Sequence, residues 1–164
     1  MAKRAKALRG HFTPQHPEKW IINEKSLGKG AIEYRSSWEL RMMNYCDQHS
    51  SILKVSSEPF AIPYLSPLDG KVHRYYVDFY VEMKKKDGST EKVLIEVKPH
   101  AETKKPRQNK KSPAAYRRAV VTYIRNQAKW DACHSFCEKN GMRFLIMTEY
   151  ELGLKTKKVR KACT

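Results

Sequence analysis

The sequence predicts a single α/β domain in which a small sheet is flanked by helices. Residues 35–49 and 112–141 carry apolar side chains at helical spacing, whereas residues 72–83 and 91–99 alternate as strands do. The loop KKKDGST joins these two strands and is typical of an antiparallel hairpin. A chain of 164 residues is long enough for one domain with a substantial core.

The expected elements follow one another as helix, strand, hairpin, helix and strand. Ser36 is a good cap for the first helix, and Ser112 followed by Pro113 is a good start for the long second helix. Residues 52–65 contain two prolines, which predicts a bent or edge strand. Residues 142–148 predict a last strand that is buried on both faces.

Basic segments are expected at both ends of the domain. Residues 1–30 lack periodicity and predict an arm that becomes ordered on a polyanion, residues 31–152 form the domain, and residues 153–164 form a second basic tail. The chain has 33 Lys and Arg against 17 Asp and Glu, a formal charge of +16. This surplus predicts binding to nucleic acid, but it does not separate enzymes from structural proteins.

A cytoplasmic protein is predicted, because the sequence lacks targeting segments, membrane-spanning runs and a disulfide framework. The sequence has neither a signal peptide nor an apolar run of membrane-spanning length. Its 4 cysteines form no disulfide framework. Cys133 and Cys137, four residues apart, fit half a metal site or, as we favour, two small buried side chains.

The hairpin has a charged face. A loop of residues 86–88 pairs residues whose numbers sum to 174, which sets Asp78 opposite Glu96, whereas a two-residue turn mismatches the polar and apolar faces. In that register Asp78 shares one face with Tyr76, Tyr80, Glu82, Leu94, Glu96 and Lys98. The expected core face holds Tyr75, Val77, Phe79, Val81, Met83, Val93, Ile95 and Val97.

Two facing carboxylates repel each other and need a compensating cation. Lys98 offers one positive charge, and a divalent ion with a preference for oxygen ligands, Mg²⁺ or Mn²⁺, offers more. The alternative is an open face on which solvent tolerates the pair. Glu39, three residues after Ser36, is either part of a capping box or a third acid of the site. Glu58 is a weaker candidate.

The succession of Glu39, Asp78 and the triplet Glu96-Val97-Lys98 resembles the signature of the PD-(D/E)XK nucleases. That signature is an acid on a helix, an acid on a strand, and E-x-K on the next strand; Val77 stands where it has a proline. The stretches YRSSWE, HRYYVDF, IEVKP and KW…FLIMTE are further similar to TnsA-like endonucleases and to head-completion nucleases of T-even-type phages, over about residues 31–152.

The resemblance implies a restriction-endonuclease-like fold, with a mixed central sheet between helices, and DNA as the substrate. It implies that Glu39, Asp78, Glu96 and Lys98 are the catalytic set of an endodeoxyribonuclease. Asp78, Glu96 and the main-chain carbonyl of Val97 are then expected to hold Mg²⁺, for which Mn²⁺ can substitute, with Glu39 assisting. Lys98 is expected to orient the attacking water and to add positive charge beside the phosphate.

Basic side chains near these positions are candidates for DNA binding through phosphate contacts. They are Arg35, Arg41, Arg74, Lys104, Lys105, Arg107, Lys110, Lys111, Arg117 and Arg118. No familiar module for reading bases is present in the sequence.

Other functions stay open at this point. A phage-encoded protein would act in the host cytoplasm or the virion, with head or neck proteins as partners. The alternatives are a structural virion protein at the neck or portal vertex that binds DNA without cutting it, a transposon end-cleaving subunit that needs a transposase, and an RNA-binding protein.

Overall fold

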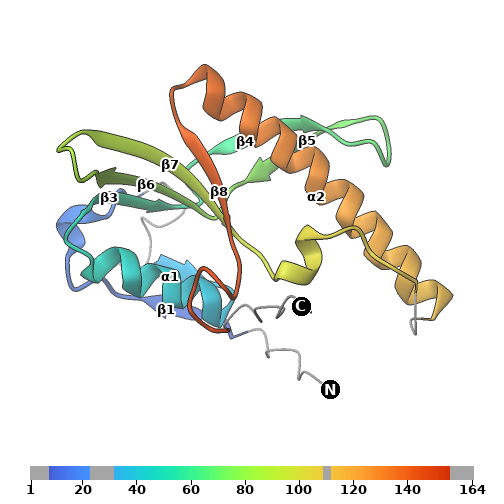
Figure 1. Cartoon of the computed structure of the whole chain (residues 1–164), viewed down its shortest axis with the longest axis horizontal. Helices are drawn as coiled ribbons and strands as arrows, with labels where there is room; N and C mark the ends of the chain where they lie inside the picture. Colours follow the sequence, from blue (N-terminus) through green and yellow to red (C-terminus); the bar gives the residue numbers. More distant parts are fainter. Residues whose placement is uncertain (1–7, 23–31, 109–111, 156–164) are drawn as a thin grey trace, which may run out of the picture.

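The computed structural model describes residues 8–22, 32–108 and 112–155. In this part of the chain, a central four-stranded sheet has the order β3-β6-β7-β8, with bounds Ile52–Ser57, Phe79–Lys84, Thr90–Val97 and Arg143–Met147. The pairs β3–β6 and β6–β7 are antiparallel and β7–β8 is parallel, so the sheet is mixed. Helix α1 (Ser37–Gln48) covers one face and α2 (Pro113–Lys139) the other (Figure 1). The predicted fold class is confirmed.

Both faces of the β6–β7 hairpin are buried. Phe79 and Val93 pack with Met43 on the α1 side, whereas Tyr80 and Leu94 pack with Trp130 on the α2 side. The face that carries Glu96 is therefore no open, solvated surface, because α2 covers it. The hydrogen-bonded ladder runs from Phe79↔Ile95 to Lys84↔Thr90, so the predicted sum of 174 is confirmed.

The prediction of one continuous strand over residues 72–83 is wrong. Strand β5 (Val72–Tyr76) pairs with β4 (Ala61–Leu65) in a second sheet, and the chain leaves this sheet at Val77 and Asp78 before β6 begins. Tyr75 and Val77 therefore lie on the α2 side with Tyr80, and not on the α1 side with Phe79 as expected. The alternation of faces shifts by one residue at the break.

The predicted bend within residues 52–65 is confirmed. Strand β3 ends at Ser57 and β4 begins at Ala61, and Glu58 between them has a positive φ of 44°. This left-handed conformation is uncommon for a residue with a side chain. The main-chain N–H of Glu58 donates to the carbonyl of Asp78 at 2.9 Å, which holds the two bends side by side.

The helices begin where the sequence predicts. Ser36 Oγ accepts the N–H of Glu39 at 3.1 Å and caps α1, and Ser112 Oγ accepts the N–H of Ala115 at 3.3 Å and caps α2. Gly141, just after α2, has a φ of 62° that suits glycine at a helix end. The two cysteines of α2 are buried free thiols, as favoured from the sequence. None of the described helices is long and apolar enough to cross a membrane.

The last strand differs in burial from the prediction. Phe144 is buried, but Leu145 and Ile146 are only partly covered, on the α1 and α2 sides respectively. The reason is its position, because β8 lies at the edge of the sheet and has a partner strand on one side alone.

Part of the segment expected to be a basic arm is built into the domain. Strand β1 (Gly10–Phe12) pairs with β2 (Ile32–Tyr34), the short helix η1 spans Pro17–Lys19, and Phe12 and Trp20 are buried in the core. The folded part of the chain therefore begins before residue 31. The other expected arm residues, 1–7 and 23–30, lie outside the described residues, as do residues 156–164 of the expected tail.

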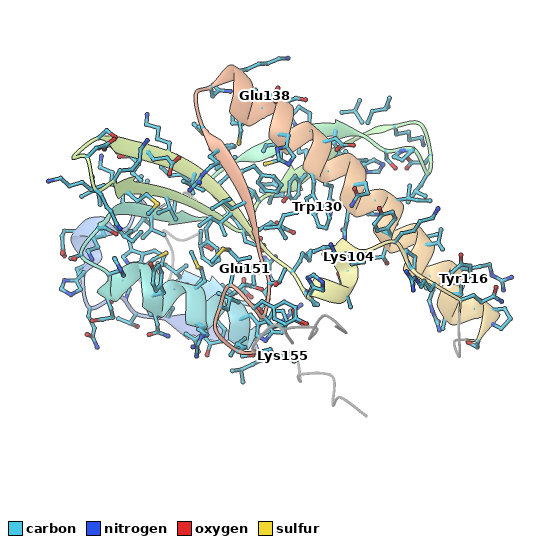
Figure 2. All side chains as sticks on the ribbon, viewed as in Figure 1. Lys104, Tyr116, Trp130, Glu138, Glu151 and Lys155 are labelled. Carbon is cyan, nitrogen blue, oxygen red and sulfur yellow. The ribbon has the colours of Figure 1, made fainter. Side chains whose placement is uncertain are left out.

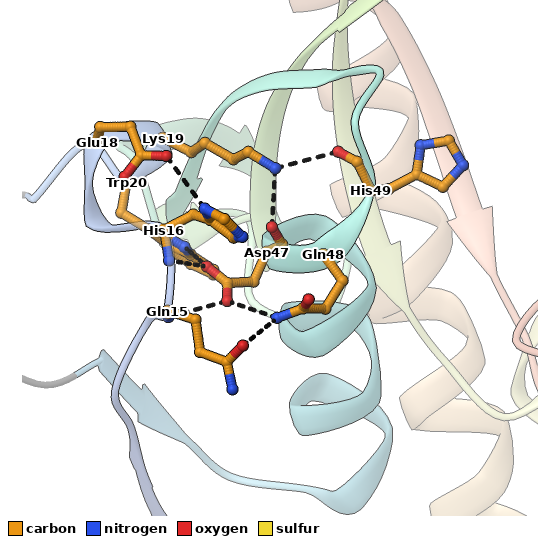
Figure 3. A network of polar contacts seen from close by, with 8 residues as sticks. All are labelled: Gln15, His16, Glu18, Lys19, Trp20, Asp47, Gln48 and His49. Carbon is orange, nitrogen blue, oxygen red and sulfur yellow. Dashed lines mark hydrogen bonds and ion pairs between the residues drawn. The ribbon is translucent and has the colours of Figure 1, made fainter.

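Asp47 on α1 anchors this N-terminal segment (Figure 3). Its buried carboxylate accepts the N–H groups of Gln15 at 2.9 Å and His16 at 3.2 Å, together with Trp20 Nε1 at 2.9 Å. Burial alone raises the pKa of this carboxyl, but the donors outweigh burial and hold the pKa below its ordinary value. The ionised carboxylate thus ties the segment to the helix.

Candidate active site

The candidate site lies where the β6–β7 ladder ends. The last paired residues are Phe79 and Ile95. Beyond them, the main-chain N–H of Val97 donates to Asp78 Oδ2 at 2.7 Å. A side-chain carboxylate thus takes the place of the main-chain carbonyl that would accept this N–H if the strands stayed paired. This contact turns the Asp78 carboxylate toward β7. It also gives a physical reason for the strand break, because the chain bends where Asp78 reaches across.

Glu96 supplies the second carboxylate and is held from two sides. Its side chain is buried, Oε2 accepts Tyr75 O–H at 2.6 Å, and Oε1 lies 3.0 Å from Lys98 Nζ. Tyr75 stands on the second sheet, just before the strand break. The break therefore brings the phenol of Tyr75 to the E-x-K triplet, whereas an unbroken strand would place this phenol on the opposite face of the sheet.

The two carboxylates of the site carry more negative charge than the neighbouring ammonium of Lys98 neutralises. Burial and the neighbouring Glu96 carboxylate raise the pKa of Asp78 well above its ordinary value, although Lys98 and the N–H of Val97 oppose this shift. Burial lowers the pKa of Lys98, but Glu96 and Asp78 outweigh burial and raise it. Lys98 is therefore a charged ammonium, and it is unsuited to act as a free base.

Glu39 makes the capping box, and its charge also acts on Asp78. Its carboxylate accepts Ser36 O–H at 2.8 Å and the N–H of Arg35 at 2.9 Å, and it adds to the raised pKa of Asp78. The capping-box interpretation of Glu39 is confirmed, whereas its role as a third acid of the site stays a prediction. Glu58 pairs with Arg35 Nη1 at 2.8 Å, so its carboxylate is engaged beside the site by an arginine.

Asp78 and Glu96 fit a divalent cation, although two side chains make a sparse ligand set. Within residues 8–22, 32–108 and 112–155, no group of three or more His, Cys, Asp or Glu side chains forms a ready metal cluster. The fit is instead electrostatic, since the raised pKa of Asp78 reports negative charge that a cation would relieve. Carboxylate oxygens are the ligands that Mg²⁺ prefers, and each can accept more than one contact.

Two of the basic candidates line a hollow beside α2. A hollow of about 690 Å³ lies between the short helix η2 (His100–Thr103) and the first half of α2, and Glu102, Lys104 and Arg118 line it. Glu102, which lines the hollow, follows Lys98 by four residues, and its charge contributes to the raised pKa of Lys98. Figure 2 shows Lys104 on the η2 side of this region.

The other basic candidates are dispersed. Arg41 donates through Nε to the carbonyl of Leu152 at 2.7 Å, which is a structural contact. Arg74 is exposed on β5 in the second sheet, and Arg35 is exposed but paired with Glu58. The remaining described candidates, Lys105, Arg107 and Arg117, are exposed, whereas Lys110 and Lys111 lie outside the described residues.

Sequence reasoning missed two residues at the site. Tyr75 was expected to be a core residue, and it is buried, but its hydroxyl donates to Glu96. Lys129 of α2 was not a candidate, although its charge interacts with Glu96, Lys98 and Asp78. The only sequence signal for Lys129 was its place in the KW stretch of the family resemblance.

Comparison with known proteins agrees with this geometry. The family model described as TnsA-like endonuclease N terminal matches residues 49–149, which include the strand break, the E-x-K triplet and all of α2. The chain belongs to the TnsA-like endonuclease family. It is also 35% identical over 138 residues to the head completion nuclease of Enterobacteria phage T4, covering 80% of this chain and 89% of that protein. The resemblance predicted from the sequence is confirmed.

Proposed function

We propose that this chain is a Mg²⁺-dependent endonuclease of the PD-(D/E)XK type that hydrolyses phosphodiester bonds of DNA. The observation that carries the proposal is the juxtaposition of two carboxylates and an ammonium at the end of the β6–β7 ladder. Glu96 lies 3.0 Å from Lys98, and its charge raises the pKa of Asp78. Such a set of charges binds a cation and a phosphate together.

Each residue has a separate task in this proposal. Asp78 and Glu96 would hold the Mg²⁺, with the main-chain carbonyl of Val97, and Glu39 would assist from the start of α1. Bound Mg²⁺ would lower the pKa of a water molecule and neutralise charge that develops on the phosphate. Lys98 keeps its proton, orients the attacking water and stabilises the phosphate oxygens. Tyr75 fixes the Glu96 carboxylate through the hydrogen bond of 2.6 Å.

The proposed biological role is completion of phage heads, with DNA as substrate and head or neck proteins as partners. Support comes from the T4 protein, whose name is head completion nuclease and of which this chain covers 89%. A transposon end-cleaving subunit is the second candidate, because the matching family model is TnsA-like. That candidate predicts a purified chain that is inactive alone and cleaves only when a transposase partner is added.

The deciding experiment measures DNA cleavage by matched aspartate variants. Linear and supercoiled DNA are incubated with wild type, Asp78→Asn and Asp87→Asn in Mg²⁺, in Mn²⁺ and in EDTA. Asp87 lies at the exposed hairpin turn, where asparagine before glycine is well tolerated. We expect wild type and Asp87→Asn to cleave with metal, and Asp78→Asn to be inactive.

Two results would contradict the catalytic assignment. Equal cleavage by Asp78→Asn and wild type would move the active site elsewhere. Absence of cleavage by all three proteins, with tight DNA binding, would favour a structural virion protein that retains the fold without the chemistry.

A further inference from the structure

Lys129 lies on a stripe of α2 whose buried donors lack acceptors in the described structure. Its neighbours Asn126 and Trp130 are buried, with exposed fractions of 6% and 5%, yet Asn126 Nδ2 and Trp130 Nε1 have no hydrogen-bond partner there. Lys129 is half-buried, and none of the ion pairs among the described residues includes it. A partly desolvated ammonium without a paired anion is poorly stabilised.

Lys129 lies on the site side of α2. Its Nζ is 5.4 Å from the centre of the Tyr75 ring and 5.9 Å from that of Tyr64, and the hydroxyl of Tyr75 donates to Glu96. Figure 2 shows Trp130, the next residue, between α2 and the sheet. The ammonium thus approaches the carboxylates from α2, whereas Lys98 approaches them from β7.

The charge on Lys129 is poorly compensated. Burial lowers its pKa, Lys98 and Arg125 act in the same direction, and Glu96 and Asp78 only partly oppose them. Contacts with aromatic faces favour the ammonium but do not replace a hydrogen-bonded anion. A group with negative charge and several acceptor oxygens would supply the anion that the ammonium lacks.

We propose that Lys129 binds a backbone phosphate of DNA at the Glu96 site. The inference rests on the proposed function in taking DNA as the ligand, and it adds a binding residue outside the E-x-K triplet. Arg118 in the hollow lies about three helical turns nearer the start of α2. The DNA backbone would therefore run from the carboxylates along α2 toward Arg118 in the hollow.

The test is the salt dependence of DNA binding in EDTA, where metal-dependent cleavage does not interfere. The logarithm of the DNA association constant falls linearly with the logarithm of the salt concentration, and each lost phosphate contact lowers the magnitude of this slope by about 0.9 for duplex DNA. We expect Lys129→Met to lower the slope by about this amount, and Lys129→Arg to keep the wild-type slope. Lys139→Met is the matched control, because Lys139 is exposed at the far end of α2. A wild-type slope for Lys129→Met, or equal losses in both methionine variants, would overturn the inference.

Asn126→Leu is a second control, one helical turn from Lys129. Its amide nitrogen is buried and has no acceptor in the described structure, so its replacement by an apolar side chain of similar volume should keep the wild-type slope. A loss of slope in Asn126→Leu equal to that in Lys129→Met would contradict the inference, because it would report a disturbed helix and not a lost phosphate contact.

These results separate the inference from the proposed function. A chain that never cleaves DNA but shows the lower slope for Lys129→Met would disprove the catalysis and leave the phosphate site. A chain that cleaves through Asp78 but shows no change of slope would do the reverse.

Discussion

Replacement of Asp78 by asparagine tests whether the site without metal holds excess negative charge that a cation would neutralise. The amide keeps the shape of the side chain and an oxygen that accepts the N–H of Val97, now 2.7 Å from Asp78 Oδ2. It removes the negative charge that Glu96 disfavours. We therefore expect Asp78→Asn to be more stable than wild type at neutral pH without metal.

The magnitude follows from the charges at the site. Two unit charges about 5.5 Å apart, as for facing side chains on paired strands, repel by about 3 kcal/mol at an effective dielectric constant of about 20. Lys98, which lies 3.0 Å from Glu96, offsets part of this repulsion. A net gain of about 1–2 kcal/mol would raise the melting temperature by about 3–8 °C for a chain of this size.

The pH dependence gives the sign of the effect. The folded state of wild type holds the Asp78 proton more tightly than the unfolded state does, so its stability falls as pH rises from about 4 through the raised pKa. Below about pH 4 the aspartic acid is neutral in both states, and the advantage of Asp78→Asn should vanish.

Thermal unfolding with and without Mg²⁺ completes the assay. Mg²⁺ should raise the melting temperature of wild type and of Asp87→Asn, but not that of Asp78→Asn, because binding to the folded state alone stabilises it. A metal-free Asp78→Asn protein that is less stable than wild type at pH 7 would refute the reasoning. So would an equal response to Mg²⁺ in all three proteins.

Other substitutions give further expected outcomes. Lys98→Met should abolish cleavage and lower the free energy of unfolding by about 3 kcal/mol in urea titrations, since it leaves a buried carboxylate without its ammonium, whereas Lys85→Met at the exposed hairpin tip should change neither. Tyr75→Phe should remove about 2 kcal/mol of stability. It should also slow cleavage by about tenfold, measured as a single-turnover rate. An unchanged rate would show that Tyr75 does not position Glu96 for catalysis. Asp47→Ala should lose about 3 kcal/mol at pH 7, because four donors, Gln48 Nε2 among them, lose this acceptor, and it should expose Trp20 to fluorescence quenchers. The lowered pKa of Asp47 stabilises the fold above about pH 4, so the difference from wild type should shrink as pH falls below that value; a constant difference down to pH 2 would contradict this assignment.

The hairpin was predictable because its side-chain pattern allows only one register. Alternating apolar positions on both strands exclude a two-residue turn, and the observed pairing of Phe79 with Ile95 follows. The same pattern could not reveal the break at Val77 and Asp78. Neither glycine nor proline marks it, and its cause is a tertiary contact, the hydrogen bond from the N–H of Val97.

Residues that reach the site from other elements were the hardest to predict. Lys129 depends on how α2 is rotated against the sheet, and helical periodicity does not fix that rotation for a helix with half-buried residues along much of its length. The burial of Trp20 likewise depends on partners far along the chain, the acceptor Asp47 on α1 and the bridge to Val55 on β3. Composition instead made the whole N-terminal region look like a charged arm.

The docking of residues 10–20 limits where this protein can be shortened. Removal of everything before residue 31 would discard 7 of the 33 Lys and Arg residues. It would also take two aromatic side chains out of the interior and leave a buried carboxylate on α1 without its donors. Biochemists who wish to separate electrostatic attraction from chemistry should therefore neutralise individual lysines and arginines, and keep the polypeptide from Gly10 onward.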